Sequence, residues 1–327
     1  MAYKVCITDQ IPSICKNILT ENKIEVVEWS MPTPPSFQEL VEFTANCDGI
    51  VSMLGNKIDS NFLSSCPQLK VISNYAVGFN NIDITEATRR NIAVGNLPGT
   101  LTETTAELAL ALILAVSRKI VQGHKDVEQG KWERWLPSGY LGRDLQGKTL
   151  GIVGMGAIGQ ALAKKCHHGF KMNIIYCSRT PKPQVEQELK ATKVEFQELL
   201  KRSEIISVHT PLTPETTAMF NYQAFEQMQQ RPIFINTARG QVHDENALTT
   251  ALDQGMIWGA GLDVTNPEPI SSESPLLHME NVVITPHIGS ATDTTRERMA
   301  KMAAENILAG LNRKELPGFV NPEVYNA

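Results

Sequence analysis

The sequence predicts an α/β protein built from two doubly wound parallel sheets. Three observations support this fold class. The chain has 327 residues, enough for about two domains. Short β-like runs alternate with helical runs in both halves, which is typical of parallel sheets covered by helices. A glycine motif, Gly154-x-Gly156-x-x-Gly159, lies between a buried-strand pattern and a helical run.

Composition narrows the class of protein. Hydrophobic residues make up 42% and charged residues 20%, as in an ordinary globular protein. The net charge of −5, with no Lys/Arg cluster, argues against nucleic-acid binding. The start reads as a strand rather than a signal peptide, and the apolar stretch 108–116 is too short to span a bilayer. We therefore expect neither a nucleic-acid nor a membrane partner.

The cysteines predict a reducing environment. All six are scattered, with no Cys-x-x-Cys, and most lie in apolar runs: Cys6, Cys15, Cys47, Cys66, Cys166 and Cys177. Such cysteines behave as small buried hydrophobic residues. We expect a cytoplasmic protein without a disulfide framework and without a metal site.

The first hundred residues alternate strand and helix patterns. The predicted strands are 4–8, 24–29, 49–53, 70–74 and 92–94, and the predicted helices are 11–19, 37–44 and 84–90. After Leu97-Pro-Gly-Thr100, a nearly all-apolar helix is predicted from Leu101 to about Gln122, bridging two domains. A polar loop containing Trp132 and Trp135 follows.

A second αβ series begins at residue 149. Its six predicted strands are 149–153, 172–177, 205–209, 232–236, 258–263 and 282–285, the number expected of a full dinucleotide-binding sheet. The last predicted helix, 292–310, has no further strand to cover there, so we expect it to return to the first domain. This predicts a discontinuous substrate domain, 1–100 with 291–327, and a dinucleotide-binding domain, 101–290.

The glycine motif predicts where a dinucleotide binds. Gly154 allows a tight turn, Gly156 lets backbone N–H groups approach a pyrophosphate, and Gly159 allows close packing of helix on strand. The helix N-terminus then offers unpaired N–H groups and a positive dipole end to the phosphates. The alternative is a tight turn without a ligand. The predicted phosphate loop comprises Gly154, Met155, Gly156, Ala157, Ile158 and Gly159.

The end of the second strand of this series indicates which coenzyme binds. NAD-specific domains usually carry Asp or Glu here, about 20 residues after the glycines. This chain has Ser178-Arg179-Thr180 instead. The hydroxyl groups can donate to a 2′-phosphate, and the guanidinium can pair with it through two N–H groups. We predict a preference for NADP(H), with NAD(H) still possible if Arg179 is only a solvated loop residue.

Three strand ends each carry one reactive group. Arg239 follows Ile235-Asn-Thr-Ala, Glu268 follows Gly261-Leu-Asp-Val-Thr-Asn-Pro, and His287 follows Ile284-Thr-Pro. Separately, these could be a surface arginine, a solvated glutamate and a buried histidine. Ligands of open α/β sheets bind at the carboxyl ends of the strands, where the three groups converge.

These motifs resemble the D-isomer-specific 2-hydroxyacid dehydrogenases over essentially the whole chain, and are most similar to those of the glyoxylate/hydroxypyruvate reductases. The markers are Asn74-Tyr-Ala-Val-Gly-Phe-Asn-Asn-Ile-Asp83, Thr104-Thr-Ala-Glu107, the Gly147–Gly159 segment, Ile235-Asn-Thr-Ala-Arg-Gly240, Gly261-Leu-Asp-Val264 and Pro286-His-Ile-Gly-Ser290. The resemblance implies a flavodoxin-like substrate domain, a Rossmann coenzyme domain and a cleft between them. The implied activity is NADPH-dependent reduction of glyoxylate and hydroxypyruvate to D-2-hydroxyacids.

The resemblance also implies residue roles. Arg239 would bind the substrate carboxylate, His287 would donate a proton to the carbonyl oxygen, and Glu268 would bond the other imidazole nitrogen. The backbone N–H groups of Val77 and Gly78 would form a second carboxylate anchor, although the pair could equally be a simple β-turn. Further coenzyme contacts are implied at Thr105, Pro211, Thr237, Ala238, Asp263 and Gly289; Ala238 stands where serine is frequent, which puts a side-chain contact there in doubt. Asp83 is interpreted as a helix N-cap.

Other functions stay open at this point. Another 2-oxoacid reductase, or 3-phosphoglycerate dehydrogenase, would share the same catalytic residues. The family also contains nucleotide-sensing corepressors, a binding rather than a catalytic function. A homodimer is implied by the resemblance, with the helix at 108–116 and the Trp132/Trp135 loop as candidate interfaces, unless these segments are domain core.

Overall fold

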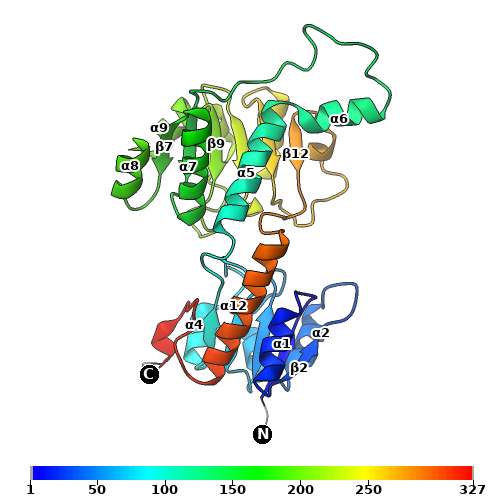
Figure 1. Ribbon diagram of the computed structural model, residues 1–327, viewed down its shortest axis with the longest axis vertical. Helices are drawn as coiled ribbons and strands as arrows, with labels where there is room; N and C mark the ends of the chain where they lie inside the picture. The colour runs from blue at the N-terminus through cyan, green and yellow to red at the C-terminus, as the bar shows by residue number, and fades with distance from the viewer. Residues whose placement is uncertain (1–2, 326–327) are drawn as a thin grey trace. The chain divides into compact units, whose positions relative to one another are not determined.

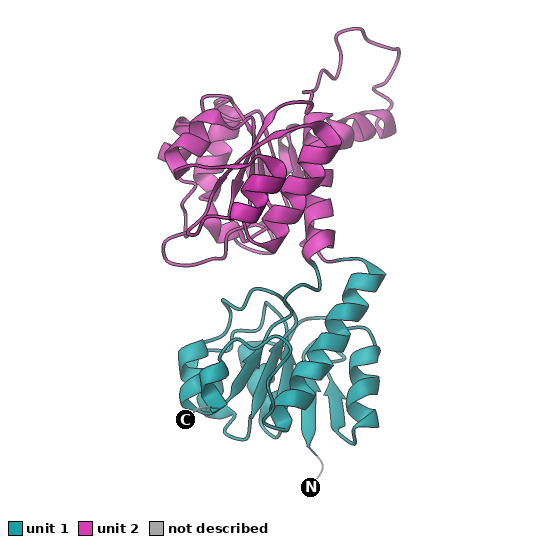
Figure 2. Cartoon of the chain, turned by 60° about the vertical axis from the view of Figure 1, so that its left-hand side comes forward, with its two compact units in different colours: residues 1–101, 291–327 teal, residues 102–290 magenta. Residues whose placement is uncertain are grey.

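A computed structural model describes residues 3–325. The chain divides into two compact units (Figure 2). Unit 1 combines the chain up to Leu101 with the chain from Ala291 onward, and unit 2 is Thr102–Ser290. Each unit contains one parallel sheet with helices packed on it, so the predicted α/β class is confirmed.

Unit 1 contains a five-stranded sheet in the order β2-β1-β3-β4-β5, and every neighbouring pair is parallel. This is the flavodoxin-like order. The strands are β1 (Lys4–Ile7), β2 (Glu25–Glu28), β3 (Gly49–Ser52), β4 (Val71–Asn74) and β5 (Ala93–Gly95). The helices between them are α1 (Ile14–Glu21), α2 (Phe37–Thr44), α3 (Ser60–Ser65) and α4 (Ile84–Arg89).

Local signals account for most of these helix boundaries. Ser36 and Glu39 form a capping box at the start of α2. Asp83 caps α4 by accepting a hydrogen bond from the backbone N–H of Glu86, which confirms its interpretation as an N-cap. The sequence analysis did not anticipate α3, which has six residues and begins at the N-cap Asp59.

Helix α12 (Asp293–Leu311) belongs to unit 1 and packs against α1 and strands β3, β4 and β5 (Figure 1). Its small residues Ala300, Ala303 and Ala304 are fully buried. A Cβ on Gly310 would lie 2.4 Å from Cγ2 of Val71, so glycine permits the helix to approach β4 closely.

Unit 2 contains a seven-stranded parallel sheet in the order β12-β11-β10-β9-β6-β7-β8. Read from β8, this is the dinucleotide-binding order 3-2-1-4-5-6 with one further strand. The strands are β6 (Thr149–Val153), β7 (Asn173–Cys177), β8 (Thr192–Lys193), β9 (Ile205–Val208), β10 (Ile233–Asn236), β11 (Gly259–Leu262) and β12 (Val282–Ile284). The covering helices are α7 (Ala157–Phe170), α8 (Pro183–Leu189), α9 (Phe196–Arg202), α10 (Tyr222–Glu226) and α11 (Glu245–Asp253).

The predicted count of six strands was wrong because β8 was missed. This strand is two residues long, both exposed, at the edge of the sheet beside β7. An exposed edge strand without apolar residues produces no hydrophobic pattern for the sequence to reveal.

The predicted helix 101–122 is two helices, α5 (Thr102–Ser117) and α6 (Ile120–Glu128). The break occurs at Lys119, whose backbone is left-handed with φ of 52°. Helix α5 lies beside α7 and on strands β10 and β11 (Figure 1). Its residues Leu112, Ile113 and Val116 are in the unit 2 core, whereas Leu108, Leu110 and Leu114 are only partly buried and Ala111 is exposed.

In the described residues 3–325, no helix is long and apolar enough to cross a membrane. The same part of the chain holds no group of three or more His, Cys, Asp or Glu side chains arranged to bind a metal ion. Its six cysteines are all free thiols.

Candidate active site

The glycine motif joins the carboxyl end of β6 to α7. Gly154 has a φ of 96°, and a Cβ there would lie 2.6 Å from the carbonyl group of His209, so the tight turn requires glycine. A Cβ on Gly159 would lie 2.4 Å from the carbonyl oxygen of Gly154, so this residue lets α7 pack against the turn. Both positions behave as their places in the motif predict.

Gly156 is not required by close packing, unlike the other two glycines of the motif. It is the N-cap of α7, and no atom lies within 4 Å of the position its Cβ would occupy. The space in front of the helix N-terminus is therefore open to a phosphate group. Met155 is buried in the core, whereas Ala157 and Ile158 open the first turn of the helix.

The loop after β7 is folded by its own hydrogen bonds. The hydroxyl of Ser178 donates to the carbonyl oxygen of Thr180 at 2.7 Å. The Tyr176 hydroxyl, on a fully buried ring, accepts from the backbone N–H of Lys182 at 2.7 Å and donates to Glu186 at 2.5 Å. Arg179 and Thr180 are exposed. The loop thus presents a cation and hydroxyl groups, with no carboxylate at the end of β7.

The turn after β10 carries Thr237 and Ala238. The Oγ1 atom of Thr237 is buried and lacks a hydrogen-bond partner within the described protein. Such atoms are rare, and one in a predicted coenzyme site fits a ligand that would supply the missing partner. The backbone N–H of Ala238 donates to the Asn236 side chain, so it is already used.

Arg239 is held in place through its backbone and its neighbour Gly240. The buried Asn236 amide donates to the Arg239 carbonyl oxygen at 2.8 Å. A Cβ on Gly240 would lie 2.0 Å from the carbonyl oxygen of Thr265, so two loop backbones touch at this point. Burial lowers the pKa of Arg239, and the nearby carboxylate of Glu268 opposes that shift. The guanidinium stays charged and is partly withdrawn from water.

Glu268 and His287 form a hydrogen-bonded pair, with 2.5 Å between Oε1 and Nδ1. Burial pushes the pKa of Glu268 upward. Hydrogen bonds from His287 and the Thr265 backbone, with the charge of Arg239, outweigh this effect, so the net pKa is lowered. The carboxylate therefore stays ionised, and because it holds Nδ1 of His287, Nε2 is the ring nitrogen left outside this pair.

Asp263 holds the loop that carries His287. Its side chain is 2% exposed and accepts hydrogen bonds from the backbone N–H groups of Ile288 and Gly289 and from the Thr285 hydroxyl, at 2.7–2.8 Å. His287 itself has a left-handed backbone, with φ of 54°. We expected Asp263 only as a coenzyme contact. Its supporting role gave no sequence signal, because it depends on how the loop folds back.

Thr105, Gly289 and Pro211, which are also predicted coenzyme positions, lie on different elements. Thr105 is buried in the first turns of α5, and a Cβ on Gly289 would lie 3.3 Å from Thr105 Cγ2. Pro211 is exposed in the loop after β9. Thr105 and Gly289 are thus in close proximity, and glycine lets the His287 loop approach α5.

Val77 and Gly78 lie in unit 1, in the loop after β4. Their carbonyl oxygens accept from the side chains of Asn96 and Asn74, at 2.7 and 2.8 Å. Within residues 3–325, their two N–H groups donate no hydrogen bond. Two adjacent free N–H groups on a loop fixed through its carbonyl groups are suited to hold a carboxylate.

A network of asparagines, not foreseen from the sequence, braces this loop. Asn74 Nδ2 bonds the side-chain oxygen of Asn81 at 3.2 Å, and Asn81 Nδ2 donates to the carbonyl oxygens of Met53 and Asn56 at 3.2 and 3.0 Å. The loops after β3 and β4 are thereby tied together. The run Asn74-Tyr-Ala-Val-Gly-Phe-Asn-Asn81 is the only signal that could have indicated the network.

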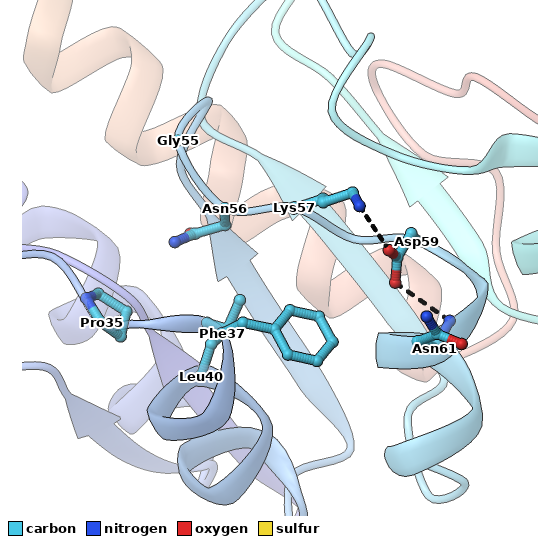
Figure 3. Close-up of a pocket in the computed structure, with 8 residues that line it drawn as sticks. All are labelled: Pro35, Phe37, Leu40, Gly55, Asn56, Lys57, Asp59 and Asn61. Carbon is cyan, nitrogen blue, oxygen red and sulfur yellow. Dashed lines mark hydrogen bonds and ion pairs between the residues drawn. The ribbon is translucent and has the colours of Figure 1, made fainter. Parts of the chain in front are cut away.

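Two cavities in the described part of unit 1 are lined by none of the predicted site residues. One, of about 450 Å³, is lined by Pro35, Phe37, Leu40, Gly55, Asn56, Lys57, Asp59 and Asn61 (Figure 3). Lys57 pairs with Asp59 at 3.0 Å across its rim. A second, of about 440 Å³, lies beside Tyr75 and Arg296. The candidate site therefore lies at the converging reactive groups of unit 2 and not in these two cavities.

Comparisons with known proteins identify relatives of this chain. Residues 110–289 match the family model described as D-isomer specific 2-hydroxyacid dehydrogenase, NAD binding domain. The chain is 47% identical over 335 residues to a glyoxylate reductase of Thermococcus litoralis, covering 99% of this chain and 98% of that protein.

Solved structures show the same architecture. A protein from Thermus thermophilus is 43% identical with a TM-score of 0.90, covering 97% of this chain and 99% of that one. An NADPH-dependent glyoxylate/hydroxypyruvate reductase of Sinorhizobium meliloti, solved with NADP and malonate, is 29% identical with a TM-score of 0.85 and 98% coverage of both chains.

Proposed function

The chain belongs to the D-isomer-specific 2-hydroxyacid dehydrogenases, and from this premise we propose that it reduces small 2-oxoacids, glyoxylate and hydroxypyruvate, to D-2-hydroxyacids with NADPH. The observation that carries the proposal is the convergence of Arg239 with the bonded pair Glu268–His287 at the strand ends of unit 2. The named activities of the relatives support the choice of substrates.

Each proposed catalytic residue has one task. Arg239 binds the substrate carboxylate through its planar fork of N–H groups. Glu268 fixes the orientation and the tautomer of His287 through Nδ1. NADPH, when bound, would supply a hydride to the carbonyl carbon. The proton on Nε2 of His287 goes to the carbonyl oxygen, which yields the hydroxyl group and a neutral imidazole.

We propose that Val77 and Gly78 hold the second side of the carboxylate through their free backbone N–H groups. The proposed coenzyme contacts are the phosphate loop 154–159, together with Thr105, Pro211, Thr237, Ala238, Asp263 and Gly289. The open space at Gly156 and the unpartnered Thr237 hydroxyl support this assignment. The Asp263 carboxylate and the Ala238 N–H already make hydrogen bonds within the protein, so any contact of theirs to the coenzyme would be additional to these bonds.

An absorbance assay at the reduced-coenzyme band, run across a panel of small 2-oxoacids, tests the activity. Glyoxylate and hydroxypyruvate should give the highest kcat/KM. His287→Ala and His287→Gln should lower kcat by about 10²–10⁴-fold with coenzyme binding retained, because only the proton donor is lost. Arg239→Ala should impair both KM and kcat. Near-wild-type rates in either variant would refute these roles.

Selection of NADPH by Arg179 has its own test. Loss of a charge-assisted pair with the 2′-phosphate should raise the KM for NADPH by about tenfold to a hundredfold in Arg179→Ala, and should leave the KM for NADH unchanged. Arg202→Ala, which removes an exposed arginine paired with Glu198, is the control. Equal wild-type efficiency with both coenzymes would contradict the preference.

We also propose a homodimer that uses the segment 120–141. The helix at 108–116 stays a candidate as well, through its partly buried Leu108, Leu110 and Leu114. The segment 120–141 includes the Trp132/Trp135 loop. It carries a run of exposed apolar side chains that a second copy would cover: Ile120, Val127, Trp132, Trp135, Leu136, Tyr140 and Leu141. A cytoplasmic location is proposed from the scattered free cysteines.

A further inference from the structure

His243 is a buried histidine that the proposed mechanism does not use. It follows the short 3-10 turn Gly240–Val242, four residues after Arg239, and it is 2% exposed. Its ring packs edge-on against Phe234 of β10, with 6.0 Å between ring centroids. Its Nε2 atom is buried and has no hydrogen-bond partner in the described structure.

The Asn236 amide determines what His243 can do. The amide oxygen accepts from the N–H of Ala238, and the amide nitrogen donates to the carbonyl oxygen of Arg239. Because a backbone N–H only donates and a carbonyl oxygen only accepts, the orientation of the amide is fixed. The second N–H of that nitrogen points to Nδ1 of His243 at 3.0 Å.

It follows that Nδ1 of His243 must accept a hydrogen bond. The imidazole is therefore neutral, with its proton on Nε2, the atom that lacks a partner. An unpaired buried donor is unfavourable. An aliphatic side chain could pack against Phe234 without burying an unpaired donor. Packing alone therefore does not explain why histidine stands at this position.

We propose that His243 is a positioning residue for Arg239, acting as the acceptor that fixes the Asn236 amide and, through it, the Arg239 carbonyl group. The inference rests on the proposed role of Arg239 in binding the substrate carboxylate. Without the acceptor, Asn236 is left with one unpaired N–H in a fully buried position, and only its bonds to Ala238 and Arg239 still hold it in the turn. The guanidinium would then lose its alignment with the substrate, where errors of about an ångström are costly.

The test compares three variants of the full chain by kinetics and thermal unfolding. His243→Leu should raise the KM for glyoxylate about tenfold and lower kcat, with the KM for NADPH unchanged. Its Tm should stay near wild type, because one unpaired N–H is exchanged for another. His243→Asn, whose side-chain oxygen can replace Nδ1 as acceptor, should restore kcat/KM to within about threefold. His243→Met serves as the second apolar variant if the leucine variant does not fold.

A double-mutant cycle separates this inference from the proposed function. Arg239→Lys should be impaired on its own, and adding His243→Leu should then cost less than about twofold more, since both act through one group. A further tenfold loss would overturn the positioning role, as would wild-type kinetics in both apolar variants. If Arg239→Lys is itself unimpaired, the proposed function fails instead. In the ¹⁵N spectrum of the histidines at pH 7, a proton on Nδ1 of His243 would also overturn the inference.

Discussion

At the residue scale, the reactive groups were visible in the sequence and their supports were not. Arg239, Glu268 and His287 each follow a recognisable strand, and parallel strands bring their carboxyl ends to one edge. The supports depend on contacts between loops: Gly240 against Thr265, and Asp263 under residues 288 and 289. Contacts of this kind join loops that are far apart in the sequence, so the spacing of residues along the chain does not reveal them.

The close contact at Gly240 predicts that adding a single methyl group there lowers both stability and activity. In Gly240→Ala the added Cβ would collide with the Thr265 carbonyl oxygen at 2.0 Å, so one loop must move. The free energy of unfolding should fall by about 1–3 kcal/mol, and kcat/KM for glyoxylate should fall at least about tenfold. Denaturant titration and steady-state kinetics measure both.

Gly169→Ala is the matched control. Gly169 lies in α7 with open space around its Cβ position, so alanine there should stabilise by about 0.5–1 kcal/mol with activity unchanged. If Gly240→Ala behaved like this control, close packing of the two loops would not be what aligns Arg239.

The Glu268–His287 pair predicts a change in the pH dependence of the reaction. In Glu268→Gln the carboxylate that stabilises the protonated imidazole is gone, so the decline of kcat/KM with rising pH should begin at a lower pH. Glu273→Gln, an exposed carboxylate in the same unit, is the control and should leave the profile in place. An unmoved profile in the Glu268 variant would speak against the pair as the proton-donating unit.

At the element scale, long buried elements were predictable and short exposed ones were not. Strands β1, β3, β6 and β9 were placed within one or two residues because they are continuous apolar runs. Strand β8 and helix α3 were missed, since neither has enough apolar residues to set a period. The break between α5 and α6 was missed for another reason: it depends on a left-handed lysine, which pattern alone does not reveal.

The exposed segment 120–141 predicts the oligomeric state. Trp132 and Trp135 are 62% and 78% exposed. Leaving such large apolar side chains in water is unfavourable for a monomer, whereas an interface with a second copy would bury them. The double variant Trp132→Ser/Trp135→Ser should shift the mass measured by light scattering from two chains to one. Trp29→Ser, in unit 1, is a control for loss of tryptophan. A wild-type protein already at monomer mass would refute the dimer.

At the scale of the whole molecule, the buried His243 predicts a loss of stability in acid. Burial lowers its pKa from the ordinary 6.5 to about 4. Between these values the unfolded chain binds a proton that the folded chain does not, so stability is complete above about pH 6.5 and declines as the pH falls toward 4. The full effect is about 3 kcal/mol.

Denaturant unfolding at pH 7 and at pH 4.5 measures this dependence. His243→Leu should lose less stability between the two pH values than the wild type, because it has no imidazole to protonate. An identical loss in both proteins would mean that His243 does not titrate in this range. The comparison is independent of catalysis, since only folding is followed.

The order of the chain has a consequence for how the molecule is made. The face of β3, β4 and β5 that α12 covers is translated before unit 2, whereas Ala300, Ala303 and Ile307, which fill the core there, are translated after unit 2. On the ribosome, unit 2 can therefore reach its native state before unit 1, although unit 1 begins first. Until α12 has been made, the apolar face of the nascent sheet stays uncovered, and exposed apolar surface of this kind favours aggregation.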